Sequence, residues 1–188
     1  TFNFISSWFV YGNVDFPAKE TSICNPKGFY SITKKAAEEL IISFCKVFKK
    51  DYRIIRLCNV MGNFDKDSST KKNALTHMID LLKQDKEVFL YDNGDPTRDI
   101  LHVEDVCDAI NLICCSGNIN EIYNVGSGNS TRIGYIINKS KEILNSNSKI
   151  KFKKAPEFHE IVQTKHFSMD ISKIRKMGFK PRYNINNI

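Results

Sequence analysis

Short apolar runs, typical of buried strands, alternate along this chain with longer segments whose apolar residues recur at helical spacing. We expect strands at residues 2–6, 52–60, 88–91, 122–125 and 150–152, helices at 26–48, 74–83, 133–144 and 171–177, and a further helix ending near residue 115. In the first of these helices the spacing is kept by Ala37, Leu40, Ile41, Phe44 and Val47. The repeated order of strand and then helix predicts an α/β fold built on a parallel sheet.

The composition is ordinary for a globular protein with one hydrophobic core: 188 residues, 41% hydrophobic and 26% charged. No apolar run approaches the ~20 residues of a membrane span, so we expect no membrane partner. The chain starts with Thr1-Phe2-Asn3-Phe4-Ile5, which has neither an initiator Met nor a charged signal segment and resembles a strand entered midway. We therefore expect the chain to be a fragment that has lost preceding sequence.

The formal charge of +7 comes mainly from scattered lysines and not from an arginine-rich stripe. This distribution suits an anionic small molecule at least as well as nucleic acid, and we expect no nucleic-acid partner. The six cysteines show no C-x-x-C spacing, so neither a zinc site nor a disulfide framework is indicated. They lie mostly in apolar stretches, which predicts buried thiols in a reducing cytoplasm.

Two residues four apart on the first expected helix, Tyr30 and Lys34, form the most informative pair for chemistry. This spacing brings the phenol and the ammonium onto one helix face, where the positive charge favours the phenolate. Ser7, in the segment Ser6-Ser7-Trp8-Phe9-Val10-Tyr11-Gly12, could supply a hydroxyl to the same site. Together they could accept a proton from an alcohol, as in half of an oxidoreductase site. Taken alone, a Tyr/Lys pair of this spacing is usually a surface pair.

The order of several segments gives this pair its context. Six segments follow one another along the chain: Ser6-Ser7, Val10-Tyr11-Gly12, Asn25-Pro26, the Tyr30/Lys34 pair, Arg56-Leu57-Cys58-Asn59-Val60-Met61-Gly62 and Met177-Gly178-Phe179-Lys180-Pro181. This order resembles the extended short-chain dehydrogenase/reductase family, which includes nucleotide-sugar epimerases and dehydratases such as UDP-glucose 4-epimerase. The resemblance covers nearly the whole chain.

The resemblance implies the carboxy-terminal part of a Rossmann-like, doubly wound parallel sheet with a smaller α+β substrate-binding lobe. Residues 1–62 would form part of the dinucleotide-binding domain, and 63–188 mainly the lobe, with about 100–115 returning to the sheet. The glycine-rich phosphate loop of such a domain is expected before residue 1. Without it, the isolated fragment is expected to be inactive.

The resemblance also implies roles for individual residues. Tyr30 would be the acid/base on the sugar hydroxyl, Lys34 would hold the nicotinamide ribose, and Ser7 would hydrogen-bond the reacting oxygen. Val60 would lie near the nicotinamide of NAD, with NADP as the alternative cofactor, and no metal is expected. Asn59 would contact the nucleotide-sugar substrate, although a turn-forming Asn is an equal alternative.

Three more residues would bind the substrate by the same resemblance. Arg98 would contact the pyrophosphate, a task that suits a guanidinium fork, and Asn73 would present a polar group to the phosphates. Phe89 would pack along the nucleotide base, although ordinary core is the favoured alternative for this residue. A structural role is expected for a second set, which would organise a turn or cap a helix: Asp99, His102 and Asp105. Gly126-Ser127-Gly128 is expected to be a turn and not a phosphate loop.

One departure from the family pattern bears on the reaction. Dehydratases of the family follow the Ser/Thr with an acidic pair, whereas this chain has Trp8-Phe9 there. We therefore favour an NAD-dependent nucleotide-sugar epimerase that inverts C4 through a transient keto sugar, acting as a homodimer through the Tyr/Lys helix. A ketoreductase using NADPH and a non-catalytic sugar-nucleotide-binding fragment remain alternatives, and the nucleotide and the sugar stay open.

Overall fold

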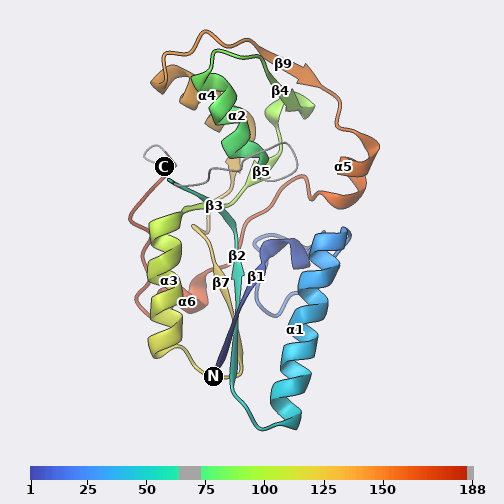
Figure 1. The fold of residues 1–188 in the computed structure, drawn as a ribbon, viewed down its shortest axis with the longest axis vertical. Coiled ribbons are helices and arrows are strands. Elements are labelled where there is room, and N and C mark those ends of the chain that lie inside the picture. The colour runs from blue at the N-terminus through green and yellow to red at the C-terminus, as the bar shows by residue number, and fades with distance from the viewer. Residues whose placement is uncertain (64–72, 186–188) are drawn as a thin grey trace.

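Three parallel strands form the central sheet of the computed structural model, which describes residues 1–63 and 73–185. The order is β1 (Phe2–Ser7), β2 (Tyr52–Leu57) and β7 (Glu121–Val125). Helix α1 (Phe29–Val47) lies on one face, and α3 (Val103–Ser116) and α6 (Ser172–Lys176) lie on the other (Figure 1). A parallel sheet covered by helices on both faces confirms the predicted Rossmann-like α/β fold.

The centre of β2 shows why a continuous apolar run was needed there. Ile54 and Ile55 are consecutive, so their side chains point to opposite faces, yet both are completely buried. The main hydrophobic cluster also draws on Leu101, Val106 and Ile174. Residues 100–115, β7 and the segment around α6 thus all pack against the sheet, although they lie far along the chain.

A second, smaller unit lies beyond the carboxyl ends of the sheet strands, at the upper end of Figure 1. It contains α2 (Ala74–Lys83), β4 (Val88–Tyr91), α4 (Ile133–Ile143) and β9 (Ile150–Lys153), with β4 and β9 paired in parallel. Its core is formed by Leu82, Val88, Leu90 and Ile137. The exposed face of β4 carries Phe89, which is 36% exposed, so the core alternative for this residue is wrong.

Short elements connect the two units. β3 (Asn59–Met61) pairs in parallel with β6 (Ile100–His102), and β5 (Thr97–Arg98) pairs antiparallel with β8 (Thr131–Arg132). The strand expected at 52–60 is therefore split at Cys58, because β2 pairs with β1 and β7 whereas β3 pairs with β6. Three further short helices are η1 (Trp8–Val10), η2 (Asp92–Gly94) and α5 (Glu157–Val162), the last of which was not predicted.

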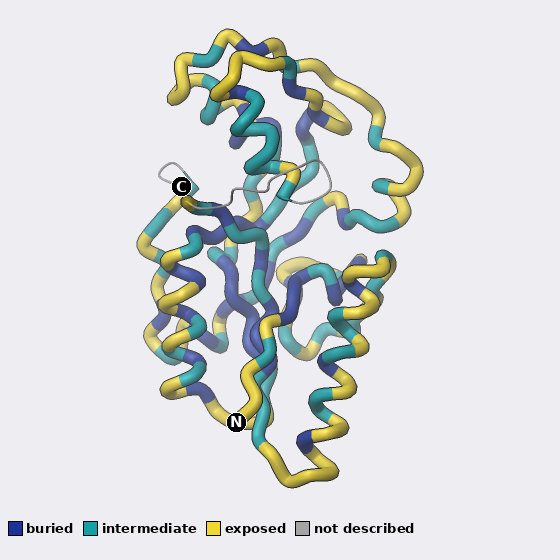
Figure 2. The backbone as a smooth tube through the Cα atoms, viewed as in Figure 1, coloured by how far each residue is buried: buried dark blue, intermediate teal, exposed yellow. Residues whose placement is uncertain are grey.

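Helix α1 packs against the sheet in an unusual way. The helix itself is confirmed, but much of its apolar stripe faces outward: Leu40 is 71% exposed and Phe44 is 55% exposed. The exposed side is visible as a mostly yellow and teal helix in Figure 2. Its buried positions are Ser31, Glu38 and Cys45, spaced seven residues apart. Within the described part of the chain, no side chain of α1 belongs to a hydrophobic cluster.

The thiols are less uniformly buried than expected. Cys45 and Cys58 are buried, but Cys107 and Cys115 are exposed on α3, so the prediction of buried thiols is wrong for these two. Burial raises the pKa of the Cys58 thiol well above its usual value. Residues 1–63 and 73–185 contain no helix long and apolar enough to cross a membrane, and no cluster of side chains suited to a metal ion.

Candidate active site

The carboxyl end of β1 brings the first candidate residue into place. Ser7 is the last residue of the strand and the N-cap of η1, where its extended backbone turns into the short helix. The Phe9 backbone N–H donates to Ser7 Oγ at 3.3 Å. Ligands of parallel α/β sheets bind at this edge, beyond the carboxyl ends of the strands.

The first turns of α1 place Tyr30 and Lys34 beside β1. The helix starts after Gly28, whose backbone N–H donates to Ser31 Oγ at 2.9 Å. Lys34 Nζ donates to the Ile5 carbonyl at 2.8 Å and lies 5.9 Å from the centroid of the Tyr30 ring. The Tyr30 side chain is 56% exposed, so its hydroxyl is accessible to a ligand.

An aromatic wall formed by Trp8 and Phe9 links Ser7 to Tyr30. The two rings are stacked with centroids 4.1 Å apart, and Phe9 meets the Tyr30 ring edge-on at 6.0 Å. Trp8 is buried and Phe9 is half-buried. Apolar rings therefore occupy the two positions that follow Ser7, and the second of them, Phe9, stands beside the Tyr30 ring.

On the other side of this wall lies Arg98. Its guanidinium carbon is 5.3 Å from the Trp8 ring, and its nitrogens donate to the Thr97 carbonyl at 2.8 Å, the Lys165 carbonyl at 3.0 Å and Gln163 Oε1 at 3.3 Å. Among the described residues, Arg98 forms no ion pair with a carboxylate. Burial lowers the pKa of Arg98 to about 10, and the group still carries its charge at neutral pH. A partly desolvated cation without a counter-charge is suited to bind an anionic ligand.

The other predicted site residues are spread over both units. Asn59 Nδ2 donates to the Asp99 carbonyl at 3.1 Å, and Val60 packs against the main hydrophobic cluster. Asn73 is the N-cap of α2 with a left-handed backbone (φ 50°). Phe89, on β4, has Lys153 Nζ 3.3 Å from its ring centroid. Ser7, Tyr30, Lys34 and Arg98 thus surround the aromatic wall, while Asn73 and Phe89 belong to the smaller unit.

Asp99 confirms its predicted structural role. Its carboxylate accepts backbone N–H donors from Ser127 at 2.8 Å, Gly128 at 3.1 Å and Met169 at 3.2 Å, and it is completely buried. The carboxylate thereby fixes the predicted turn at residues 126–128, which leads from β7 to the short strand β8 and not directly to a helix. Burial raises the pKa of Asp99, and these donors act in the opposite direction.

His102 and Asp105, which were also expected to have structural roles, differ from one another. His102 is the N-cap of α3, and its Nδ1 accepts from the Glu104 backbone N–H at 3.3 Å, which confirms a capping role. Asp105 instead accepts from the backbone N–H groups of Arg182 and Tyr183 at 3.0 and 3.1 Å. It therefore attaches the end of the chain to α3, and the expectation that it caps the helix is wrong.

A buried polar network next to the site was missed by the sequence analysis. Glu38 and Arg56 form a two-pronged ion pair, Nε to Oε1 at 2.9 Å and Nη2 to Oε2 at 2.7 Å, and Ser6 Oγ donates to Glu38 Oε1 at 2.6 Å. Burial is the largest influence and acts to lower the pKa of Arg56, but the hydrogen bond with Glu38 and the charge interactions with Tyr11, Glu38 and Cys24 together raise the pKa above its usual value. Two sequence signals could have revealed the network: Glu38 is four residues after Lys34, and Arg56 interrupts an apolar strand.

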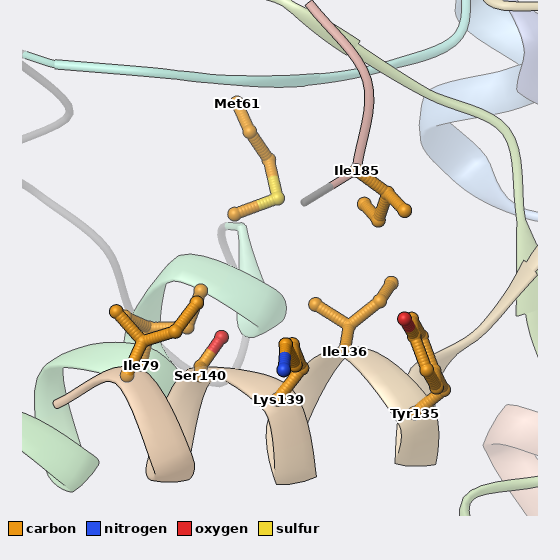
Figure 3. A pocket seen from close by; sticks show the side chains of 8 residues that line it. Met61, Ile79, Tyr135, Ile136, Lys139, Ser140 and Ile185 are labelled. Carbon is orange, nitrogen blue, oxygen red and sulfur yellow. The ribbon is translucent and has the colours of Figure 1, made fainter. Parts of the chain in front are cut away.

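The apolar cavity shown in Figure 3 is a different place. It lies between α2, α4 and the strand end at Met61, and is lined by Ile79, Ile136, Ile143 and Ile185. Its volume of about 30 Å³ is far below the roughly 300 Å³ of a small-molecule site. The cavity is therefore too small to hold a nucleotide sugar.

Comparison with known proteins places the fold and the site in a family. The model of the NAD dependent epimerase/dehydratase family matches residues 1–126, well over half of the chain. The chain belongs to this family. The matched residues include the whole wall and both members of the Tyr30/Lys34 pair, and the family is NAD-dependent, with similar solved structures that hold NAD or NADPH.

Relatives within the epimerase/dehydratase family have several activities. A Methanocaldococcus jannaschii protein provisionally named UDP-glucose 4-epimerase is 27% identical over 94% of this chain and 56% of its own length. The GDP-6-deoxy-D-mannose reductase of Pseudomonas aeruginosa is 32% identical over 73% of this chain and 46% of its own. The crystal structure of UDP-glucose 4-epimerase from Thermotoga maritima, with UDP-glucose, is 26% identical, with a TM-score of 0.88 over 99% of this chain and 60% of its own. The chain thus spans about half to three fifths of these relatives.

Lys34 and Tyr30 of this epimerase/dehydratase family member have the chemistry to bind the nicotinamide end of the cofactor. Lys34 Nζ has a backbone carbonyl as its hydrogen-bond acceptor, and within residues 1–63 and 73–185 it forms no ion pair with a carboxylate. An ammonium has three donors, so it can also bind ribose hydroxyls. The accessible Tyr30 ring stands on the same helix face, one turn earlier.

Proposed function

We propose that the complete protein is a nucleotide-sugar epimerase that uses NAD to invert C4 of the sugar through a transient keto sugar. The observation that carries the choice of epimerase is the Phe9 ring, which stands edge-on to Tyr30 at 6.0 Å. Elimination of water would need a second acid and base beside Tyr30, and Phe9 and Trp8 can provide neither. Epimerisation needs one group that removes and returns one hydroxyl proton.

In the proposed reaction, Tyr30 accepts the proton of the sugar C4 hydroxyl and later returns it. Lys34, whose ammonium is 5.9 Å from the Tyr30 ring centroid, favours the phenolate through its charge and binds the nicotinamide ribose. Ser7 hydrogen-bonds the same sugar oxygen from the end of β1. NAD held beside these groups would supply the hydride acceptor and donor for C4 of the sugar.

Residues beyond the aromatic wall bind the nucleotide part of the substrate, away from Tyr30. Arg98 binds the pyrophosphate with the guanidinium edge that no carboxylate of the described residues occupies. Asn73 contributes a polar group at the start of α2, and Phe89 offers an accessible ring for the nucleotide base, with Lys153 beside it. Asn59, on β3, contacts the nucleotide sugar, and Val60, the next residue of that strand, lies near the nicotinamide. Binding energy from the nucleotide thereby positions the sugar at Tyr30.

Reduction of a keto sugar with NADPH is the second candidate. It is favoured by the 32% identity with a GDP-6-deoxy-D-mannose reductase, the highest among the relatives compared above. The residues named above would serve both reactions, since a reductase also needs Tyr30 to exchange a proton with the sugar oxygen. The two reactions differ in whether the cofactor is consumed.

An assay of the complete gene product separates these candidates. UDP-, GDP-, CDP- and dTDP-hexoses are incubated with catalytic amounts of NAD, and the products are resolved by chromatography and proton NMR. We expect inversion at C4 with no net change in absorbance at 340 nm. Stoichiometric consumption of NADPH on a 4-keto sugar would instead establish the reductase, and the absence of both activities would contradict the proposal.

The exposed apolar stripe of α1 predicts how the complete protein forms a homodimer. In the complete protein we expect a homodimer through Leu40, Phe44 and Phe48, which form an apolar surface around the 4.5 Å contact between the two phenylalanine rings. The double substitution Leu40→Glu/Phe44→Glu places charges in that surface and is expected to give a monomer by light scattering. The matched control, Ile143→Glu on the exposed side of α4, should remain dimeric. A variant that stays dimeric would exclude α1 as the interface.

A further inference from the structure

Polar groups make the closest contacts between the sheet and the middle of the helix that carries Tyr30 and Lys34. None of its side chains joins a hydrophobic cluster within the described residues, and its buried positions are Ser31, Glu38 and Cys45. Apolar burial is non-directional, so a helix held by it can slide or rotate slightly at little cost. A helix held by hydrogen bonds of fixed geometry cannot, because small displacements lengthen or bend those bonds.

Glu38 makes the strongest of these polar contacts. Its carboxylate is completely buried and takes two hydrogen bonds from Arg56 of β2, at 2.9 and 2.7 Å, in the fork geometry that fixes both distance and angle. It also accepts from Ser6 Oγ at 2.6 Å. Lys35, one turn before on the same helix, approaches the second carboxylate oxygen at 3.8 Å.

The partners of Glu38 are the neighbours of the catalytic groups. Ser6 directly precedes Ser7 in β1, and Glu38 follows Lys34 by four residues, so that Tyr30, Lys34 and Glu38 lie along one side of α1. Arg56 is the register partner of Ser6 in the β1–β2 ladder. One carboxylate therefore joins the helix of the acid/base to the strand of the hydroxyl, through contacts of at most 2.9 Å.

Arg56 is itself held from its other side. Its guanidinium carbon lies 4.7 Å from the centroid of the Tyr11 ring, and the Tyr11 hydroxyl donates to Asn124 Oδ1 at 2.6 Å. Asn124 Nδ2 in turn donates to the carbonyls of Ala18 and Asp170 at 2.9 and 3.1 Å. The anchor for Glu38 is thus a buried network that extends across β2 to β7, and not one flexible side chain.

We propose that Glu38, Arg56 and Ser6 are positioning residues, which set the place of Tyr30 and Lys34 relative to Ser7. The proposal rests on the proposed function for the reaction that it serves. A buried ion pair adds little net stability compared with apolar residues of similar volume, although removal of one partner alone is strongly destabilising. The pair therefore explains the orientation of the helix better than it explains the stability of the fold.

The test replaces the whole network with apolar residues in the complete gene product. The triple variant Ser6→Ala/Glu38→Met/Arg56→Met leaves no charge unpaired, and we expect it to melt within about 5 °C of the unmodified protein. Its kcat should fall by about 30-fold while KM changes by less than about threefold, because the reacting groups are displaced and the substrate contacts are not. Exchange of the α1 backbone amides, measured by mass spectrometry, should be about tenfold faster, with that of β2 unchanged.

Two further variants make the result decisive. Glu39→Gln removes a carboxylate that pairs with Lys35 at 3.3 Å on the exposed side of the same helix, and it should leave kcat and amide exchange unchanged. If the triple variant does not fold, Ser6→Ala alone, which keeps the ion pair, should lower kcat by about fivefold when it is assayed well below its melting temperature, which the lost hydrogen bond should lower by less than about 10 °C.

Each outcome has a defined meaning. A folded triple variant whose kcat and α1 exchange both stay within about twofold of the unmodified protein overturns the proposal, as does an unaltered kcat in Ser6→Ala when the triple variant fails to fold. If the unmodified protein catalyses no sugar-nucleotide reaction, the proposed function fails, and amide exchange alone decides whether this network holds the helix. If kcat falls only to the extent that the melting temperature falls, Glu38, Arg56 and Ser6 have a structural role only.

Discussion

Replacement of Tyr30 by Phe is expected to lower kcat by roughly 10³-fold, within the range that a positioned acid or base contributes. The change removes one oxygen and keeps the ring, so the edge contact with Phe9 at 6.0 Å is retained. Since the hydroxyl acts on the proton that moves during the reaction, kcat and kcat/KM should fall together while KM stays nearly constant. The measurement is steady-state turnover of the nucleotide sugar identified by the assay.

A matched control uses the same chemical change at the other end of the sheet. Tyr52 is the first residue of β2, whereas the site lies beyond the carboxyl ends of the strands. Tyr52→Phe should leave kcat unchanged. Because Tyr30 is 56% exposed, loss of its hydroxyl should also change the free energy of unfolding by less than about 0.5 kcal/mol. Turnover by Tyr30→Phe within tenfold of the unmodified enzyme would remove Tyr30 from the acid/base role.

Replacement of Arg98 by Gln is expected to raise KM for the nucleotide sugar by about 100-fold, with a smaller effect on kcat. Each hydrogen bond to a charged group contributes about 1.5–3 kcal/mol, and a pyrophosphate can take two of them from one guanidinium. Arg98→Lys keeps the charge but loses the fork, so its KM should lie between those of Arg98→Gln and the unmodified enzyme. Initial rates over a range of substrate concentrations give both constants.

The control for Arg98 is an arginine that already has an anionic partner. Arg182 Nη2 lies 2.7 Å from Asp108 Oδ2, and its side chain is largely exposed. Arg182→Gln removes one positive charge, as Arg98→Gln does, but it should leave KM unchanged because the charge was already neutralised nearby. Equal effects of the two substitutions would indicate that KM responds to net charge alone, and Arg98 would lose its assignment to the pyrophosphate.

Much of the fold could be predicted from sequence because the strands and helices carry clear apolar periodicity. The segment 74–83 and the strand 88–91 were placed with their observed bounds. The sequence did not show that 52–60 would divide at Cys58, since strand pairing with two different partners is a tertiary property. Nor did it predict α5, whose six residues show no periodic pattern of sufficient length.

The candidate site was predicted in part, and the misses have physical causes. Tyr30 and Lys34 could be named from their spacing, and Ser7 and Arg98 from their places in the family's motif order; the structure brings them around Trp8 and Phe9. Glu38 and Arg56 were missed because each is an ordinary charged residue until the fold buries both. The outward direction of the α1 stripe was equally hidden, since periodicity predicts an apolar face but not the surface against which it packs.

The cap at the start of η1 uses part of the hydrogen-bonding capacity that Ser7 has for a substrate. A hydroxyl oxygen carries one hydrogen and two lone pairs, and the Phe9 N–H occupies a lone pair of Ser7 Oγ at 3.3 Å. The Ser7 hydrogen and one lone pair remain, so Ser7 keeps its full capacity to donate but half of its capacity to accept. A sugar oxygen between the two hydroxyls would then receive a hydrogen from Ser7 and give its own to Tyr30, and the backbone of a three-residue helix favours this direction of proton movement.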